Sequence, residues 1–372
     1  MRTGIADLPL HWGHAPRWLV TRMIRLAGAV VKIIVTEYGS SELIRRLADP
    51  FWFQAFGAAL GFDWHSSGVT TVVTGVLRAA IDPQELGVAV CGGKGSRSTR
   101  TPREIEEVCE SLSISSRKAE ELKRASMLAA KVDNAALQDG FPLYHHVIVF
   151  SEDGEWAIIQ QGMDVETRLA RRYHWLSEGL SSFVEEPHKA VVGARARQPV
   201  LNLVARESED ARRVMVDLVG EGVVRLKRLV AEARGFIPLD DWLRTGGRSR
   251  VRRVVRYLKM PWSINWRAVE RAYQLGPKRF EELLEVRGLG PSTLRGLALV
   301  SALIFGAEPS WRDPVKFSFA FGGKDGVPFP VNRDAMDEAI QFLGESVRMA
   351  EMGEKDRLEA LKRLSVIRGG GK

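Results

Sequence analysis

Cysteine and long apolar segments are both scarce in this chain. Only Cys91 and Cys109 occur among 372 residues, too few for a disulfide scaffold, and they could form a zinc site only together with histidine or carboxylate ligands. The most apolar early stretch, 26–35, contains Lys32 and is too short to cross the roughly 30 Å hydrocarbon core of a membrane. The first ten residues also lack the apolar run of a signal peptide. These absences lead us to expect a cytoplasmic protein that is not embedded in a membrane.

Acidic residues are fewer than basic ones. Asp and Glu total 46, Lys and Arg total 54, and the formal net charge at pH 7 is +8. Such an excess of positive charge favours polyanionic partners. The 45% of hydrophobic residues is ordinary for a globular protein, and the length allows two or three domains. For a globular protein these partners would be nucleic acid or an acidic membrane surface, and the motifs described below favour DNA, single- or double-stranded. The composition does not fix an oligomeric state.

The hydropathy pattern predicts an α+β fold that is mostly helical, with a small central β-sheet. Apolar residues recur every three or four positions through most of 16–112, which is typical of amphipathic helices. Two β-rich runs, 144–150 and 155–160, flank the turn Ser151-Glu152-Asp153-Gly154 and predict a β-hairpin.

The second half of the chain is expected to be helical as well. Helices are predicted over 167–177 and, with a break at two glycines, over 214–233. From Arg244 onward the sequence becomes basic, so we place a domain boundary just before it. This boundary separates an N-terminal and central α+β region, 1–240, which we expect to be catalytic, from a helical DNA-binding region, 241–372.

The segment 280–305 has the pattern of two helices joined by a glycine turn. Gly288 and Gly290 flank Leu289 in the turn, and Ser292 is the candidate N-cap of the second helix. Glycine lets the backbone approach a phosphate closely, while amide groups at a helix N-terminus attract its negative charge. The segment resembles the helix-hairpin-helix motif of DNA repair and replication proteins, which implies backbone binding without strong sequence preference. The alternative is an ordinary helical hairpin.

A strongly basic segment precedes this hairpin. The residues 244–259 include seven basic side chains and no acidic one, and four of the basic ones are spaced to share one helix face. A purely solvated helix usually interleaves acidic residues, so we expect this face to bind DNA, with a solubilising face as the alternative. The residues expected to contact DNA are Arg248, Arg252, Arg256, Lys259, Lys278, Arg287, Gly288, Leu289, Gly290, Ser292, Thr293, Arg295 and Lys324.

Two polar stretches in the first hundred residues are candidates for chemistry. Asp63 and His65 are spaced two apart and are ligand types that suit a divalent metal such as Mg or Mn, although Asp63 could instead cap a helix. The glycine-rich run 92–97 is expected to form a loop that cradles a phosphate with Lys94, and a plain flexible turn is equally compatible with it.

A third stretch, 160–174, combines glutamines, arginines and a histidine. A buried glutamine needs hydrogen-bond partners, and the arginines are expected to share a helix face that binds phosphate. The other histidines of this region, His145, His146 and His188, are each more often structural than catalytic when they occur alone. The full set of catalytic candidates is Asp63, His65, Lys94, Gln160, Gln161, Arg171 and His174, with Asp63 and His65 as the metal ligands.

Several long strings make the chain resemble the domain-of-unknown-function 763 family, which is largely archaeal. They are ADLPLH at 6–11, GFDWHSSG at 61–68, QQGM at 160–163, RRYHW at 171–175, FSFA at 317–320 and GGKDG at 322–326. The resemblance would place a histidine where this chain has Phe321. The order of elements over 85–190 is also similar to the chromosome-partition ParB and sulfiredoxin-like fold, in which a strand, a glycine and an arginine-rich helix bind nucleotide or DNA phosphates.

These patterns favour a DNA-processing enzyme, a nuclease that cuts DNA phosphodiesters. In this interpretation the central region supplies catalytic groups and the C-terminal hairpin holds the DNA. Two alternatives remain. A base-excision glycosylase would use Asp313, which follows the hairpin as the catalytic aspartate does in many enzymes of that class. A DNA-binding repair or scaffold protein would bind without catalysis.

Overall fold

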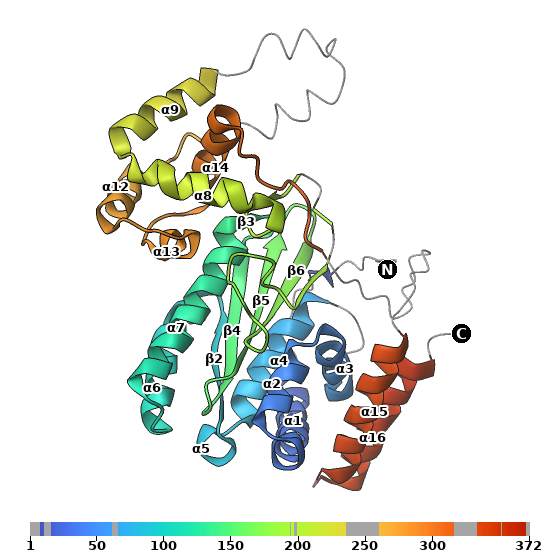
Figure 1. The fold of residues 1–372 in the computed structure, drawn as a ribbon. Helices are drawn as coiled ribbons and strands as arrows, with labels where there is room; N and C mark the ends of the chain where they lie inside the picture. Colours follow the sequence, from blue (N-terminus) through green and yellow to red (C-terminus); the bar gives the residue numbers. More distant parts are fainter. Residues whose placement is uncertain are drawn as a thin grey trace.

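The computed structural model describes residues 8–10, 16–61, 66–193, 195–196, 199–235, 260–315, 333–350 and 352–369. An antiparallel sheet lies between two layers of helices, and a group of short helices covers one end of it (Figure 1). The α+β class and the predominance of helix agree with the sequence prediction. Seven predicted site residues lie outside the described residues: Asp63, His65, Arg248, Arg252, Arg256, Lys259 and Lys324.

The sheet is built around the predicted β-hairpin. Strands β4 (Leu143–Ser151) and β5 (Trp156–Asp164) pair around the 152–155 turn, with His146 opposite Gln160. The order is β1-β6-β5-β4-β2, and β7 pairs with β6 on the same edge as β1. The remaining strands of this sheet are β1 (Leu8–Pro9), β2 (Val88–Lys94), β6 (Leu169–Leu176) and β7 (Ala190–Gly193).

The predicted helix over 167–177 is wrong, because this segment is strand β6. Its arginine spacing suggested a helix, but the segment pairs with β5, with Arg172 opposite Gln161. Both faces of β6 are covered, so neither shows the apolar and polar alternation of a half-exposed strand. The arginine-rich helix on which the resemblance over 85–190 depended is therefore absent from this part of the described chain.

One layer of helices comes mainly from the N-terminal part. Asp49 caps α3, since its carboxylate accepts from the amides of Phe51 at 2.7 Å and Trp52 at 2.8 Å, and Pro50 occupies the first helical position. The two C-terminal helices pack against α3 and extend this layer (Figure 1). The helices are α1 (Arg17–Tyr38), α2 (Ser40–Ala48), α3 (Pro50–Leu60), α4 (Ser67–Ala80), α5 (Pro83–Leu86), α15 (Arg333–Met349) and α16 (Glu354–Gly369).

The opposite layer begins with α6 and α7 and continues into the helices at the end of the sheet. Apolar residues of the sheet, of α7 and of α14 belong to one continuous core. The break predicted within 214–233 is present between α8 and α9. The helices are α6 (Thr101–Ser111), α7 (Ser116–Lys131), α8 (Glu209–Gly220), α9 (Val223–Gly235), α12 (Trp266–Leu275), α13 (Phe280–Glu285) and α14 (Pro291–Phe305).

Short elements connect the sheet to the end group of helices. A π-helical turn, Val132–Ala136, continues α7 and leads into β3 (Leu137–Gln138), which pairs with β8 (Leu201–Asn202). The Gln138 amide donates to the carbonyl of Pro291 at 2.9 Å, so this two-stranded ribbon also contacts the start of α14. Among the described helices, none is long and apolar enough to cross a membrane.

We expect Gly162→Ala to destabilise the fold by roughly 2 kcal/mol or more, because overpacking a rigid contact is costly. A Cβ added there would lie 2.0 Å from the carbonyl oxygen of Phe141, and backbone cannot move aside as a flexible side chain can. The control is Gly75→Ala in α4, where a Cβ meets nothing within 4 Å and alanine should add up to about 1 kcal/mol. Urea unfolding of both variants measures this, and a Gly162→Ala midpoint equal to that of the wild type would contradict it.

Candidate active site and helical hairpin

The buried carboxylate of Asp133 is the centre of a hydrogen-bond network on the α7 side of the sheet. Its Oδ2 accepts from Gln160 Nε2 at 2.5 Å and from Trp175 Nε1 at 2.9 Å, and its Oδ1 accepts from His188 Nε2 at 2.5 Å. The His146 ring bonds to the other end of the Gln160 amide at 2.8 Å. Asp133 lies in the π-helical turn, a distortion that often marks functional sites.

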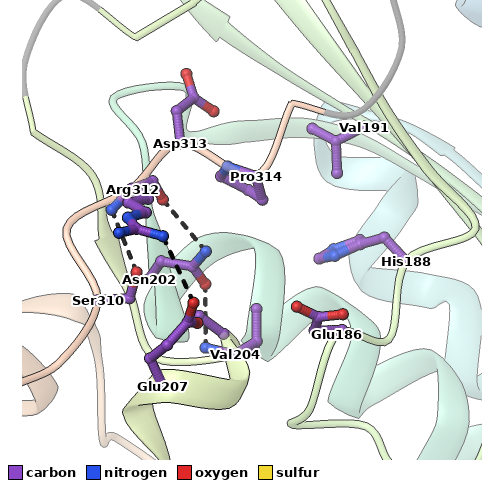
Figure 2. A pocket seen from close by; sticks show the side chains of 11 residues that line it. Glu186, His188, Val191, Asn202, Val204, Glu207, Ser310, Arg312, Asp313 and Pro314 are labelled. Atoms are coloured by element: carbon purple, nitrogen blue, oxygen red, sulfur yellow. Dashed lines mark hydrogen bonds and ion pairs between the residues drawn. The ribbon is translucent and has the colours of Figure 1, made fainter. Parts of the chain in front are cut away.

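His188 connects this network to a pocket of about 150 Å³. A carboxylate can only accept, so His188 donates from Nε2, and the lone pair of a neutral imidazole is then on Nδ1. Nδ1 has no hydrogen-bond partner among the described residues. Figure 2 shows His188 and Glu186 on one side of the pocket and Asn202 with Arg312 on the other. The lining residues are Glu186, His188, Val191, Asn202, Val204, Ala205, Glu207, Ser310, Arg312, Asp313 and Pro314.

Glu186 has a strained backbone at the edge of this pocket. Its φ is +44°, in the left-handed region that costs free energy for residues other than glycine. This backbone conformation is stabilised by a hydrogen bond of 2.7 Å from the Glu186 amide to the carbonyl of Val204. Strained residues of this kind cluster at active sites and ligand-binding loops. The strain therefore supports the pocket as the candidate active site.

Arg171 fixes Asp313 at the pocket wall. The Arg171 side chain is fully buried, donating to Asp139 at 2.8 Å through Nη1 and to Asp313 at 2.8 Å through Nη2. Burial opposes the charge, yet the nearby carboxylates raise the pKa of Arg171 above its ordinary value. The Asp313 carboxylate points away from His188 in Figure 2 and also accepts from the amide of Ala196 at 2.7 Å. Arg171 therefore positions the pocket wall, and both its Nη atoms contact carboxylates rather than facing solvent.

The other predicted residues of β5 and β6 lie on the opposite face of the sheet. Gln161 bonds to Thr70, to the Ser67 carbonyl and to the Tyr144 hydroxyl. His174 is buried edge-on against Phe53, at 5.5 Å between ring centroids, and burial holds its pKa well below the ordinary range. The sheet thus divides the predicted catalytic set, with Gln160 and Arg171 near the pocket and Gln161 and His174 away from it.

Arg172, also on this opposite face, is a buried cation. No carboxylate of the described residues lies within ion-pair distance of it, and its guanidinium stacks at 4.7 Å over the Phe53 ring. Among the described residues it has one hydrogen bond, to Thr70 Oγ1, which is 3.3 Å long. Burial lowers the pKa of Arg172 to about 9.

The expected glycine-rich phosphate loop at 92–97 is wrong, because its first three residues belong to β2. Gly92 pairs with Val147 and Lys94 with His145. Gly92 is required by close packing, since a Cβ there would lie 2.3 Å from the carbonyl oxygen of His146 at a φ of +105°. The exposed Lys94 ammonium lies 5.8 Å from the Tyr144 ring, on the face away from the pocket.

The two helices of the 280–305 hairpin are present as α13 and α14, with Leu289 fully buried in the turn. Gly288 has a φ of +93°, which requires glycine, and the N-cap of α14 is Gly290 rather than the expected Ser292. Gly290 has no side chain, so no side-chain oxygen caps the helix. The amides of Gly290, Ser292 and Thr293 have no acceptor among the described residues.

Several basic side chains lie near this turn, and two of them donate hydrogen bonds to its carbonyl groups. Lys131 donates to the Leu289 carbonyl at 3.1 Å and Arg271 to the Arg287 carbonyl at 2.6 Å, so they orient the turn. Arg287 is exposed in the same turn, while Arg295 is half-buried 5.6 Å from the Trp311 ring. The segment 278–295 contains the hairpin glycines together with three further residues that we expect to contact DNA, Lys278, Thr293 and Arg295.

Asp133 and Asp139 were not predicted as site residues, and His188 was expected to be structural. Asp133 and Asn134 interrupt the otherwise apolar segment Val132–Leu137, and an acidic residue in such a segment can indicate a buried polar contact. No comparable signal indicates that His188 contacts it across 55 residues. Within the described residues, no group of three or more His, Cys, Asp or Glu side chains could hold a metal ion.

The comparisons with known proteins show the family. The model of the family described as "Protein of unknown function (DUF763)" matches residues 4–331, most of the chain. The chain therefore belongs to the DUF763 family, as its sequence strings had indicated. No curated protein and no solved structure matches it significantly.

We expect acid to destabilise the protein because of His145. Burial lowers its pKa to about 3, whereas an unfolded histidine titrates near 6.5. Below pH 6.5 His145 binds a proton in the unfolded chain but stays neutral in the folded chain. The stability that is present above pH 6.5 is therefore lost as the pH falls toward 3. At pH 5 the loss is about 2 kcal/mol. Urea unfolding at pH 7.5 and pH 5 should show a smaller loss for His145→Gln than for the wild type, and equal losses would count against this linkage.

Proposed function

We propose that this protein is a DNA-processing enzyme, a deoxyribonuclease that binds the DNA backbone without strong sequence preference. The observation that carries the proposal is the pair of sites joined by the β3–β8 ribbon. Gln138 of β3 bonds to the Pro291 carbonyl at the start of α14, and Asn202 of β8 lines the His188 pocket. A binding element and a candidate catalytic pocket thus share one rigid support.

The α14 N-terminus supports the binding half of this proposal. Three free amides, a glycine N-cap and the positive end of a 15-residue helix are suited to a phosphate oxygen. Contacts of this kind fix the position of a DNA strand but do not read its bases. The basic net charge of +8 would add long-range attraction.

The Asp133–His188 pair supports the catalytic half. An imidazole that is oriented by a buried carboxylate and lines a pocket is suited to activate water or another nucleophile. Arg312 at the pocket rim would offer positive charge to a phosphodiester, because its contact with Glu207 at 3.7 Å is exposed and weak. A divalent metal, Mg or Mn, remains part of the proposal, with Asp63 and His65 as ligands, and both of these lie outside the described residues.

A second candidate is a base-excision glycosylase, favoured by one observation. Asp313, the residue expected to be catalytic in that class, lines the same pocket. Its carboxylate is already held by Arg171 and by two backbone amides, from Ala196 and Val315.

The remaining alternative is a DNA-binding repair or scaffold protein without catalytic activity. We propose the cytoplasm as the compartment in which either activity acts, because both cysteines are free thiols.

Ser292→Glu should weaken DNA binding about tenfold or more while leaving the fold intact. A carboxylate in the first turn of α14 stabilises the helix through its dipole but repels a phosphate at the same amides. Ser292→Ala is the matched control and should bind within about twofold of the wild type. Fluorescence anisotropy with labelled DNA measures both affinities. Unchanged binding by Ser292→Glu would remove the hairpin from the interface.

His188→Gln should lower the cleavage rate of undamaged DNA by roughly 100-fold or more, because it removes the general base. Asp133→Asn should lower it as well, since the amide cannot orient the imidazole in the same tautomer. DNA affinity should stay unchanged in His188→Gln. Assays with magnesium, with manganese and with chelator measure cleavage and its metal requirement. Strand breaks confined to damaged bases would favour the glycosylase, and no product under any condition would refute an enzymatic role.

A further inference from the structure

An exposed tryptophan lies directly beside the hairpin. The segment that precedes α12 runs alongside the start of α14: the Ser263 hydroxyl donates to that of Ser292 at 3.2 Å, and the Asn265 amide donates to Thr293 Oγ1 at 3.0 Å. Trp262 lies next to Ser263, and 78% of its surface is exposed. A tryptophan is usually well buried, so this degree of exposure calls for a reason.

Arg234 holds this tryptophan in place from α9. Its guanidinium lies 4.6 Å over the Trp262 ring and also donates to the Pro261 carbonyl at 3.1 Å. Arg234 forms no ion pair with a described acidic residue. One face of the indole is therefore covered by a cation that has no ion-pair partner among the described residues, and most of the tryptophan surface stays exposed.

This arrangement has the parts of a nucleotide-binding platform. An aromatic face stacks on any base, and an adjacent cation pairs with the phosphate backbone. The free amides of Gly290, Ser292 and Thr293 are a short distance away, on the other side of the Ser263–Ser292 contact. A strand whose phosphate binds at these amides would bring a neighbouring base to the exposed indole.

We propose that Trp262 stacks on an unpaired DNA base next to the phosphate held at the start of α14. In an intact duplex each base face is already covered by its neighbours, so only single-stranded or locally unpaired DNA offers a base to Trp262. The preferred substrate is then DNA with an unpaired nucleotide. This inference rests on the proposed function and specifies the strandedness that the hairpin alone leaves open.

The chain provides a matched control in Trp18. It is 62% exposed and has Arg22 at 5.4 Å from its ring, so it has the same pair of residue types. Trp18 lies in α1, which packs against α2, α4 and α15 in the opposite layer. Trp18→Ala therefore removes an exposed tryptophan with a cation partner but leaves the hairpin untouched.

The test measures binding of the full chain to three labelled probes by fluorescence anisotropy: a short thymidine oligonucleotide, a duplex of equal length and an abasic oligonucleotide. Trp262→Ala should weaken binding of the thymidine strand about tenfold, the loss typical of one stacked base. It should change binding of the duplex and the abasic strand by less than about twofold. Trp262→Phe should retain most of the affinity, and Trp18→Ala should match the wild type.

Two results would overturn the inference. One is equal weakening of all three probes by Trp262→Ala, which would indicate a general electrostatic or structural effect. The other is unchanged binding of the thymidine strand by Trp262→Ala while Ser292→Glu weakens it, which would leave the proposed function standing without the stacked base. If the wild type binds no probe, the proposed function fails together with this inference.

Discussion

One buried carboxylate, Asp133, determines how the end of the sheet is arranged. It is 1% exposed, and burying it is tolerable only because three side chains donate to it. Those donors come from β5, from β6 and from the segment before β7. Loss of the carboxylate would leave all three donors unsatisfied in a dry interior. The π-helical turn that carries Asp133 therefore aligns the sheet, and it also orients the histidine that faces the pocket.

A second buried polar contact extends this arrangement to the C-terminal half. Arg171 joins Asp139, just after the β3 strand, to Asp313, which follows α14. Such a buried pair contributes more to a specific geometry than to net stability. Together with the continuous apolar core under α14, it makes the hairpin and the pocket parts of one body rather than separate modules. A strand held at α14 would in this way have a fixed relation to His188.

The turns whose geometry is set by a few neighbouring residues could be predicted from the sequence. The turn at 151–154 and the glycine turn at 288–290 each determine their own backbone geometry. Strand β6 was not predictable in this way, because both of its faces are buried and only its pairing with β5 makes it a strand. The Asp133–His188 contact could not be predicted either, because tertiary packing brings together residues that are 55 positions apart. Gly92 and Gly93 indicated a loop, but both lie in β2, and Gly92 allows the close approach of β2 to β4.

The central claim is that the start of α14 binds the DNA backbone, and amide hydrogen exchange tests it most directly. The amides of Gly290, Ser292 and Thr293 have no acceptor among the described residues, so they should exchange rapidly in the free protein. If the start of α14 binds DNA, saturating DNA should slow exchange in the peptide that covers 288–294, with no comparable change in α1. Unchanged exchange in that peptide, with protection elsewhere in the chain or nowhere, would contradict the account.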